Sequence, residues 1–406
     1  MGSIAVRWWW LFMALAVGAG VVRSEDAMAP RPQTLAIGRV AKPPVLDGKL
    51  DEWGRASFLL GEARQTLRRA GRWAGALDAS AAVWLGWDEQ YLYVAADVID
   101  DKLMQAHGGA EPWQGDTLEL FFNVHPGQQR VDGFWQIALI PPLESGQKLR
   151  VTGPQKEFEG VEGTAAVHKG GYTLECRIPW KNLTGFVPGP GAQVGLQVML
   201  DDRDDAGLKS RLTWYPSAIT FNHRLQMNTL VLKEQGETSG PPMVAGPTTE
   251  VVTNPNTMTV SVLTELPGAE KAVVKVVRGN ATALVEREEG VLPTGELKLV
   301  KLGDRVAVGE GPVDIAGYEG EAEFEVEVQT GGGEVLMRSR FVTELGGRKY
   351  EAMKAMLAEC QKAVKALPAS VDEVERGGLG LWVQRIADLV PNEARPETVS
   401  ATLLAQ

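Results

Sequence analysis

Apolar and polar residues alternate with a period of two along much of the chain between residues 37 and 234. In 116–124, one face carries Leu118, Leu120, Phe122 and Val124, and the other carries Glu119, Phe121 and Asn123. The same alternation predicts strands over 79–87, 91–98, 134–140, 171–178 and 194–200. Many short strands with Gly/Pro turns and no long helical period predict an antiparallel β-sandwich over 37–234.

A second alternating region covers 243–345 and follows a polar, Gly/Pro-rich linker at 235–242. Its clearest predicted strands are 258–263, 272–277, 296–302, 321–328 and 334–342. A region of roughly 100 residues with several such strands is typical of an immunoglobulin- or fibronectin-like sandwich.

The period changes over residues 347–406, which we predict to be a helical tail. Apolar residues step by three and four through Tyr350, Met353, Leu357, Cys360, Val364 and Leu367 up to Pro368, and a second stripe runs over 379–389. The tail either folds onto the sandwich or forms a short dimerising seam. The predicted class is all-β: an N-terminal antiparallel β-sandwich, a second immunoglobulin-like β-sandwich and a short C-terminal helical segment.

The first 24 residues have the features of a secretory signal peptide. Arg7 precedes an apolar run over 8–22, and small residues lie near its end. The run is shorter than the roughly 20 residues that span a bilayer. We therefore expect residues 1–24 to be cleaved from a secreted, periplasmic or cell-surface protein with no membrane span after signal removal. Retention of the segment as an N-terminal anchor is the alternative.

Charge and cysteine content exclude some partners and scaffolds. The chain has 41 Lys+Arg and 52 Asp+Glu, a formal net charge of −11, which argues against a nucleic acid as partner. Its two cysteines are too few for a disulfide framework. Cys176 is in phase with Leu174 and Ile178, so we expect a buried core thiol.

Tryptophan is concentrated in the first predicted sandwich. Eight of the 12 tryptophans lie between residues 37 and 234, namely Trp53, Trp73, Trp84, Trp87, Trp113, Trp135, Trp180 and Trp214. Aromatic rings offer flat apolar surfaces on which the C–H faces of sugars can stack. Packing in the core is the alternative, and we expect it for Trp84, Trp87 and Trp180.

Three segments, 45–53, 113–122 and 171–180, resemble the family 9 carbohydrate-binding module and its relatives, a DOMON-like β-sandwich group. The hairpin at 83–94 and the acidic segment 201–205 fit the same order, and together these segments extend over about half of the chain. The resemblance implies a β-sandwich that binds the ends of glucan or xylan chains, usually beside a glycoside hydrolase.

The resemblance also implies a sugar site. Trp113 and Glu119 match the family's Trp and the Glu six residues after it, and Trp214 or Phe221 is the candidate for the second stacking aromatic. Where the family has Arg and Asn on the following strand, this chain has Phe134-Trp-Gln-Ile-Ala-Leu-Ile140, so Gln136 is the candidate polar contact.

The acidic segment has two interpretations. Asp201, Asp202 and Asp204, with Asp205 beside them, are candidate oxygen ligands for a structural calcium ion of the kind that family members carry. The spacing is not that of an EF-hand, so an exposed acidic turn is the alternative.

The sequence predicts a non-catalytic carbohydrate-binding protein. It contains no G-x-S-x-G, P-loop or H-E-x-x-H motif, and no motif pairs two carboxylates for glycoside hydrolysis. The expected partners are a polysaccharide or oligosaccharide and a glycoside hydrolase in polysaccharide catabolism. One alternative is a structural or envelope assembly module that has kept the sandwich and lost sugar binding. Another is a haem-binding relative that uses Met199 and His223.

Overall fold

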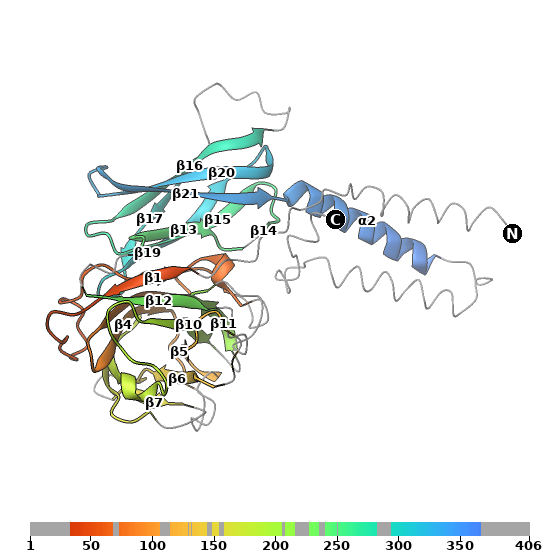
Figure 1. The fold of residues 1–406 in the computed structure, drawn as a ribbon. Helices are drawn as coiled ribbons and strands as arrows, with labels where there is room; N and C mark the ends of the chain where they lie inside the picture. The colour runs from red at the N-terminus through yellow and green to blue at the C-terminus, as the bar shows by residue number, and fades with distance from the viewer. Residues whose placement is uncertain are drawn as a thin grey trace, which may run out of the picture.

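In its described residues, the computed structural model contains two β-sandwiches and one long helix (Figure 1). It describes residues 33–67, 73–105, 114–128, 130, 132–143, 148–153, 158–204, 208–215, 227–234, 240–249, 251–281 and 294–366. The all-β prediction is confirmed, since nearly every described element is a strand.

The first sandwich has one sheet of seven strands and one of five. The seven-stranded sheet has the order β1 (Thr34–Gly38), β12 (Asn228–Lys233), β10 (Gln193–Arg203), β5 (Thr117–Asn123), β6 (Phe134–Ile140) and β7 (Arg150–Thr152), and β11 (Leu208–Thr213) also pairs with β10. The five-stranded sheet has the order β2 (Phe58–Leu60), β3 (Ala79–Trp87), β4 (Tyr91–Asp100), β9 (Gly171–Pro179) and β8 (Glu162–His168). All pairs are antiparallel except β1 with β12.

The alternation of apolar residues correctly predicted which side of the sheet faces the core. Leu118, Leu120 and Phe122 of β5 pack between the two sheets, whereas Phe121 packs on the outer face. Cys176 is fully buried in the core, and this burial raises the pKa of its thiol. The strands β3 and β6 have the predicted bounds.

The second sandwich has sheets of four and five strands. The four-stranded sheet has the order β13 (Met243–Pro247), β15 (Thr257–Thr264), β19 (Ala307–Asp314) and β18 (Val300–Lys301). The five-stranded sheet has the order β14 (Val251–Val252), β21 (Val335–Leu345), β20 (Tyr318–Gln329), β16 (Lys271–Ala281) and β17 (Thr294–Lys298). The single strand predicted over 296–302 is wrong. The chain crosses from one sheet to the other at Leu299, whose N–H donates to the Glu270 carbonyl at 2.8 Å.

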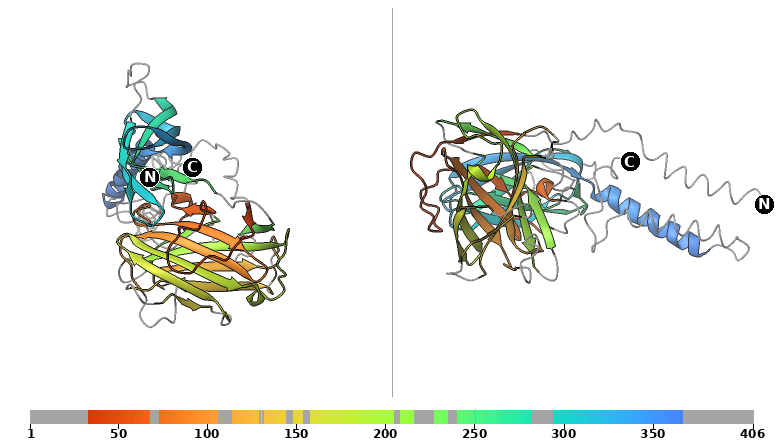
Figure 2. Two further views of the ribbon diagram at one scale, coloured as in Figure 1. Left: turned by 90° about the vertical axis from the view of Figure 1, so that its left-hand side faces the viewer. Right: turned by 60° about the horizontal axis from the view of Figure 1, so that its bottom comes forward.

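Helix α2 (Gly347–Lys365) follows β21 and projects away from both sandwiches (Figures 1 and 2). It coincides with the first predicted helical stripe, and most of its described side chains after residue 353 are exposed. The second stripe, over 379–389, lies outside the described residues. Among the helices in the described ranges, none has the length and apolar character to cross a membrane.

The two sandwiches pack directly against each other (Figure 2). Val244, Leu263, Val306 and Val308 of the second sandwich belong to the core cluster of the first. Backbone N–H groups of the first sandwich also donate to side chains of the second: Ala56 to Glu265 at 2.8 Å, Ala76 to Ser261 at 2.9 Å and Leu77 to Glu310 at 2.7 Å. These contacts fix the second sandwich onto the first.

Candidate functional site

A cluster of polar side chains lies on the outer face of the seven-stranded sheet. It consists of Glu119 on β5, Gln136 on β6, Asp201 on β10 and Arg211 on β11, and we call it the Glu119 cluster. All four residues are at most 9% exposed. They follow one another across four strands, so the cluster crosses the middle of the sheet.

Strand register brings these residues together. Met199 lies opposite Glu119, which puts Asp201 diagonally beside Glu119 on the same face. Asp201 lies directly opposite Arg211. Gln136 lies opposite Phe121 and is the diagonal neighbour of Glu119 on the other side. The period of two along each strand therefore creates a continuous polar row.

Hydrogen bonds connect the row from end to end. Gln136 Nε2 donates to Glu119 Oε1 at 2.7 Å, and Arg211 Nε donates to Asp201 Oδ1. The carboxyl groups of Glu119 and Asp201 also lie within hydrogen-bonding reach of each other. Because a carboxylate only accepts hydrogen bonds, this contact requires a proton on one of the two groups.

Burial determines the charge state of the cluster. Burial and the negative charge of Asp201 raise the pKa of Glu119 to about 8, against an ordinary value of 4.5. Burial also raises the pKa of Asp201, although Arg211 opposes the rise. With one proton shared by the two carboxyl groups and one positive charge on Arg211, the cluster is electrically neutral.

Aromatic and sulfur-containing side chains cover the same face. Phe121, Met199 and Met227 form a small apolar cluster, and Phe134 packs against it. The rings of Phe121 and Phe134 lie 6.2 Å apart at an angle of 33°. The outer face therefore combines apolar surface with hydrogen-bonding groups, which is the composition of a ligand site.

The structure brings together Glu119 and Gln136 and places Trp214 elsewhere. Trp214 belongs to the core cluster, is 7% exposed and stacks on Phe58 with ring centroids 4.2 Å apart. Its ring thus lies on the opposite side of the sheet from Glu119. Trp113 and Phe221 lie outside the described residues, so the stacking pair remains a prediction.

Arg211 is a residue of the cluster that sequence reasoning missed. The run Leu208-Lys-Ser-Arg-Leu-Thr213 forms β11, and Leu212 points into the core. That alternation alone predicts Arg211 and Thr213 on the outer face, the face of Glu119. The strand is short and contains only two large apolar residues, so its period is weak in the sequence.

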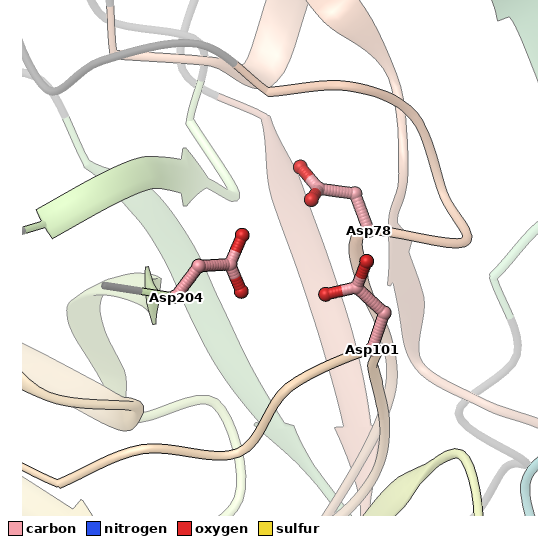
Figure 3. Close-up of side chains that lie close together, drawn as sticks. All are labelled: Asp78, Asp101 and Asp204. Carbon is pink, nitrogen blue, oxygen red and sulfur yellow. The ribbon is translucent and has the colours of Figure 1, made fainter.

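Two groups of aspartates lie at one end of the sandwich. Asp78, Asp101 and Asp204 form one group, in which the carboxylates point toward a common space (Figure 3). Asp100, Asp116 and Asp202 form the second group, which is buried. In each group, one ligand atom from every residue lies within 4.8 Å of the others. These separations fit one cation per group with carboxylate ligands.

The chemistry of the buried group fits a hard cation. Burial and neighbouring carboxylates raise the pKa of Asp100 to about 7, of Asp116 to about 9 and of Asp202 to about 8. Oδ1 of Asp202 and the hydroxyl of Tyr172 are buried and make no hydrogen bond within the described ranges. Ca²⁺ would compensate the repulsion and engage these oxygens.

The calcium prediction placed Asp201, Asp202 and Asp204 together, and the structure separates them. Successive residues of a strand point to opposite faces, so Asp201 faces the Glu119 cluster while Asp202 faces Asp100 and Asp116. Asp204 follows an irregularity in the pairing of β10 after Asp202 and joins the other group. The alternative of one exposed acidic turn does not describe Asp202, which is 1% exposed.

Comparisons with known proteins show a family to which the first sandwich is similar. Residues 46–235 match the family model described as "Carbohydrate family 9 binding domain-like". The exoglucanase XynX of Acetivibrio thermocellus is 25% identical over 223 residues, which are 53% of this chain and 18% of that protein. Endo-1,4-beta-xylanase A of Thermotoga maritima is 28% identical over 174 residues, which are 40% of this chain and 14% of that protein.

The similarity to these curated relatives thus extends over less than a fifth of their length. Among solved structures, a family 9 carbohydrate-binding module from Caldicellulosiruptor kristjanssonii in complex with cellotriose is 19% identical, with a TM-score of 0.40. That match covers 52% of this chain and 98% of the module. The resemblance predicted from the sequence is confirmed by the family match, in which residues 46–235 are similar to the carbohydrate family 9 binding domain.

Proposed function

We propose that the first sandwich binds glucan- or xylan-type chains, or their ends, on the outer face of its seven-stranded sheet. The observation that carries this proposal is the Glu119 cluster, a connected row of hydrogen-bonding groups next to Phe121, Phe134 and Met199. In this proposal Trp113 stacks on the sugar ring, and Glu119 and Gln136 bond to hydroxyls. Phe221 is the remaining candidate for the second aromatic, because Trp214 is packed on Phe58.

In this proposal the protein does not itself cleave glycosidic bonds. Glycoside hydrolysis uses two carboxyl groups roughly 5–10 Å apart, with the scissile bond between them. Glu119 and Asp201 contact each other directly, which leaves no room for a sugar linkage between them. The xylanase and exoglucanase relatives support a role beside glycoside hydrolases in polysaccharide catabolism. The predicted signal segment at 1–24 supports secretion, to the periplasm or the cell surface.

Calorimetry with the full-length chain tests the proposed function. We expect heat on titration with cellobiose or xylobiose, and loss of that heat in Trp113→Ala and Glu119→Ala. Arg177→Gln is the matched control, because Arg177 pairs with Glu162 at 2.7 Å on the other sheet. Absence of binding to cellobiose, xylobiose and insoluble cellulose and xylan would overturn the proposal.

A structural role in an envelope assembly is the second candidate. The burial of Glu119, which is 1% exposed, and the packed interface between the two sandwiches favour it. In that case the polar row stabilises the fold and takes no ligand. The same titrations decide between the two, since an assembly module gives no heat with any of the glycans.

We also propose that the two aspartate groups bind calcium and stabilise the sandwich. A ligand that binds only the folded state at 100 times its Kd adds about 2.7 kcal/mol of stability. We therefore expect EDTA to lower the Tm and CaCl₂ to restore it, and Asp202→Asn to reduce the response, because the group of Asp78, Asp101 and Asp204 is left intact. Asp132→Asn is the control, because Asp132 is exposed and pairs with Arg130. A Tm that is unchanged by both EDTA and CaCl₂ would contradict this proposal.

A further inference from the structure

The guanidinium of Arg211 has a buried nitrogen without a hydrogen-bond partner among the described residues. The residue is 6% exposed, and its Nε donates to Asp201. Its second terminal nitrogen, Nη2, is buried and makes no hydrogen bond within the part of the chain that the structure describes. Guanidinium nitrogens are donors only, and a buried donor without an acceptor is unfavourable. Such a group marks a position where a water molecule or a ligand supplies the missing acceptor.

One carboxylate oxygen of Asp201 is buried in the same way. Oδ1 accepts from Arg211 Nε, whereas Oδ2 is buried and, apart from the proton that Asp201 shares with Glu119, accepts no N–H or O–H from the described residues. Arg211 and Asp201 are directly opposite each other on β11 and β10. The pair therefore presents one donor and one acceptor side by side, next to Glu119.

We infer that Arg211 and Asp201 together bind two vicinal hydroxyl groups of a neutral sugar, with Arg211 Nη2 donating to one hydroxyl oxygen and Asp201 Oδ2 accepting from the neighbouring hydroxyl. This inference rests on the proposed function and names residues that set its specificity. Adjacent equatorial hydroxyls occur in both glucose and xylose units. A donor and an acceptor that are already hydrogen-bonded to each other are pre-organised for such a pair.

The charges of the cluster favour a neutral sugar over a uronate. Glu119 and Asp201 are two acidic groups beside a single cation, Arg211. Arg211 is already paired with Asp201 and the cluster carries no net positive charge, so it would not offset the cost of desolvating a sugar carboxylate. The neighbouring strand β6 (Phe134–Ile140) contains no Lys or Arg, so β11 supplies the cation of this face.

Deoxy sugars test the inference on the unmodified protein. Calorimetry with the full-length chain compares glucose, 2-deoxyglucose, 3-deoxyglucose and glucuronate. We expect at least one deoxy sugar to bind about tenfold to a hundredfold more weakly than glucose, because the hydroxyl that engages the charged pair is missing. Glucuronate should bind more weakly than glucose.

The double variant Arg211→Gln with Asp201→Asn is used in the second part of the experiment. It removes both charges together, so neither is left buried and unpaired, and Arg177→Gln serves as the control. We expect glucose, cellobiose and xylobiose to bind about tenfold more weakly or worse to the double variant. We also expect the variant to lose the discrimination between glucose and the deoxy sugar, which a merely structural role would not change.

The outcomes separate this inference from the proposed function. Wild-type protein that binds glucose and both deoxy sugars equally would overturn the inference while the proposed function stands. A folded double variant with wild-type affinity and discrimination would do the same. Wild-type protein that binds none of the sugars would overturn the proposed function and the inference with it. If the double variant does not fold, the deoxy sugars alone decide.

Discussion

The guanidinium of Arg305, in the second sandwich, lies over the indole ring of Trp84, in the first, at 5.6 Å from the ring centroid. The same guanidinium donates to three backbone carbonyls of the first sandwich, at 2.7 Å to Leu50, 2.8 Å to Trp53 and 3.0 Å to Gly54. The Arg305 side chain thus links the second sandwich to two parts of the first, the buried ring of Trp84 and the irregular segment 50–54. Cation–π contacts of this kind are strengthened when the partners are shielded from water.

Arg305→Ala should destabilise the protein and weaken the coupling between the two sandwiches. It removes three hydrogen bonds to backbone carbonyls of the first sandwich together with the contact to the Trp84 ring, and we expect a loss of about 2–4 kcal/mol in the free energy of unfolding. Differential scanning calorimetry should show one transition for the wild type and a broader or split transition for the variant. Arg340→Ala is the control, because Arg340 pairs with Glu325 on the exposed face of the second sandwich. A variant that unfolds like the wild type would show that Arg305 is dispensable.

Gly303→Ala should disturb the same interface by steric conflict. A Cβ at Gly303 would lie 2.4 Å from both carboxylate oxygens of Asp97, which is fully buried. Asp97 is held in place because its Oδ2 accepts from the backbone N–H groups of Arg305 at 2.6 Å and Val306 at 3.2 Å. We expect a loss of about 1–3 kcal/mol in chemical denaturation. Gly189→Ala, with open space around the new Cβ, should leave the stability near that of the wild type.

Glu119 should make the stability of the fold depend on pH. Its pKa in the folded state is about 8, above the ordinary value of 4.5, because of burial and Asp201. Its contribution to stability is therefore complete below pH 4.5 and is lost as the pH rises toward 8. Glu119→Gln keeps the acceptor for Gln136 and resembles the protonated acid. It should remove a slope of up to about 1.4 kcal/mol per pH unit between pH 5 and 8.

Urea denaturation at several pH values measures this slope. The exposed Glu159 has a carboxylate 3.6 Å from Lys181, and Glu159→Gln is the matched control, for which we expect the wild-type pH dependence. Parallel curves for the wild type and Glu119→Gln would show that Glu119 is ionised in the folded protein throughout this range.

The sequence alone predicted the strands, and the faces that they bury, wherever apolar and polar residues alternate strictly. In β5, Leu118 and Glu119 were placed on the correct faces, because only one face of that strand is buried in the main core. The strands β1, β11 and β12 were not predicted, since each is at most six residues long. Each contains only two or three large apolar residues, and β1 pairs with β12, which is distant in the sequence.

The candidate site could be predicted only in part for the same reason. Glu119 and Gln136 lie on two strands that are consecutive in the chain and pair with each other. Arg211 reaches the site through β11, about 90 residues further along, and only the register with Asp201 brings it there. The division of Asp201 and Asp202 between two faces also depends on where β10 begins and ends, which the acidic composition does not indicate.

Trp214→Phe should separate a packing role from a binding role. Trp214 is 7% exposed and stacks on Phe58 at an interplanar angle of 11°, so it contributes mainly to the core. We expect the smaller ring to cost about 1–2 kcal/mol of stability, less than the 3–5 kcal/mol typical of truncation to Ala, and to leave sugar affinity unchanged. Phe221→Ala should instead weaken cellobiose binding with little change in Tm. If Trp214→Phe stays folded and loses cellobiose binding while Phe221→Ala retains it, Trp214 and not Phe221 is the second stacking residue, and its ring must leave the contact with Phe58 when the sugar binds.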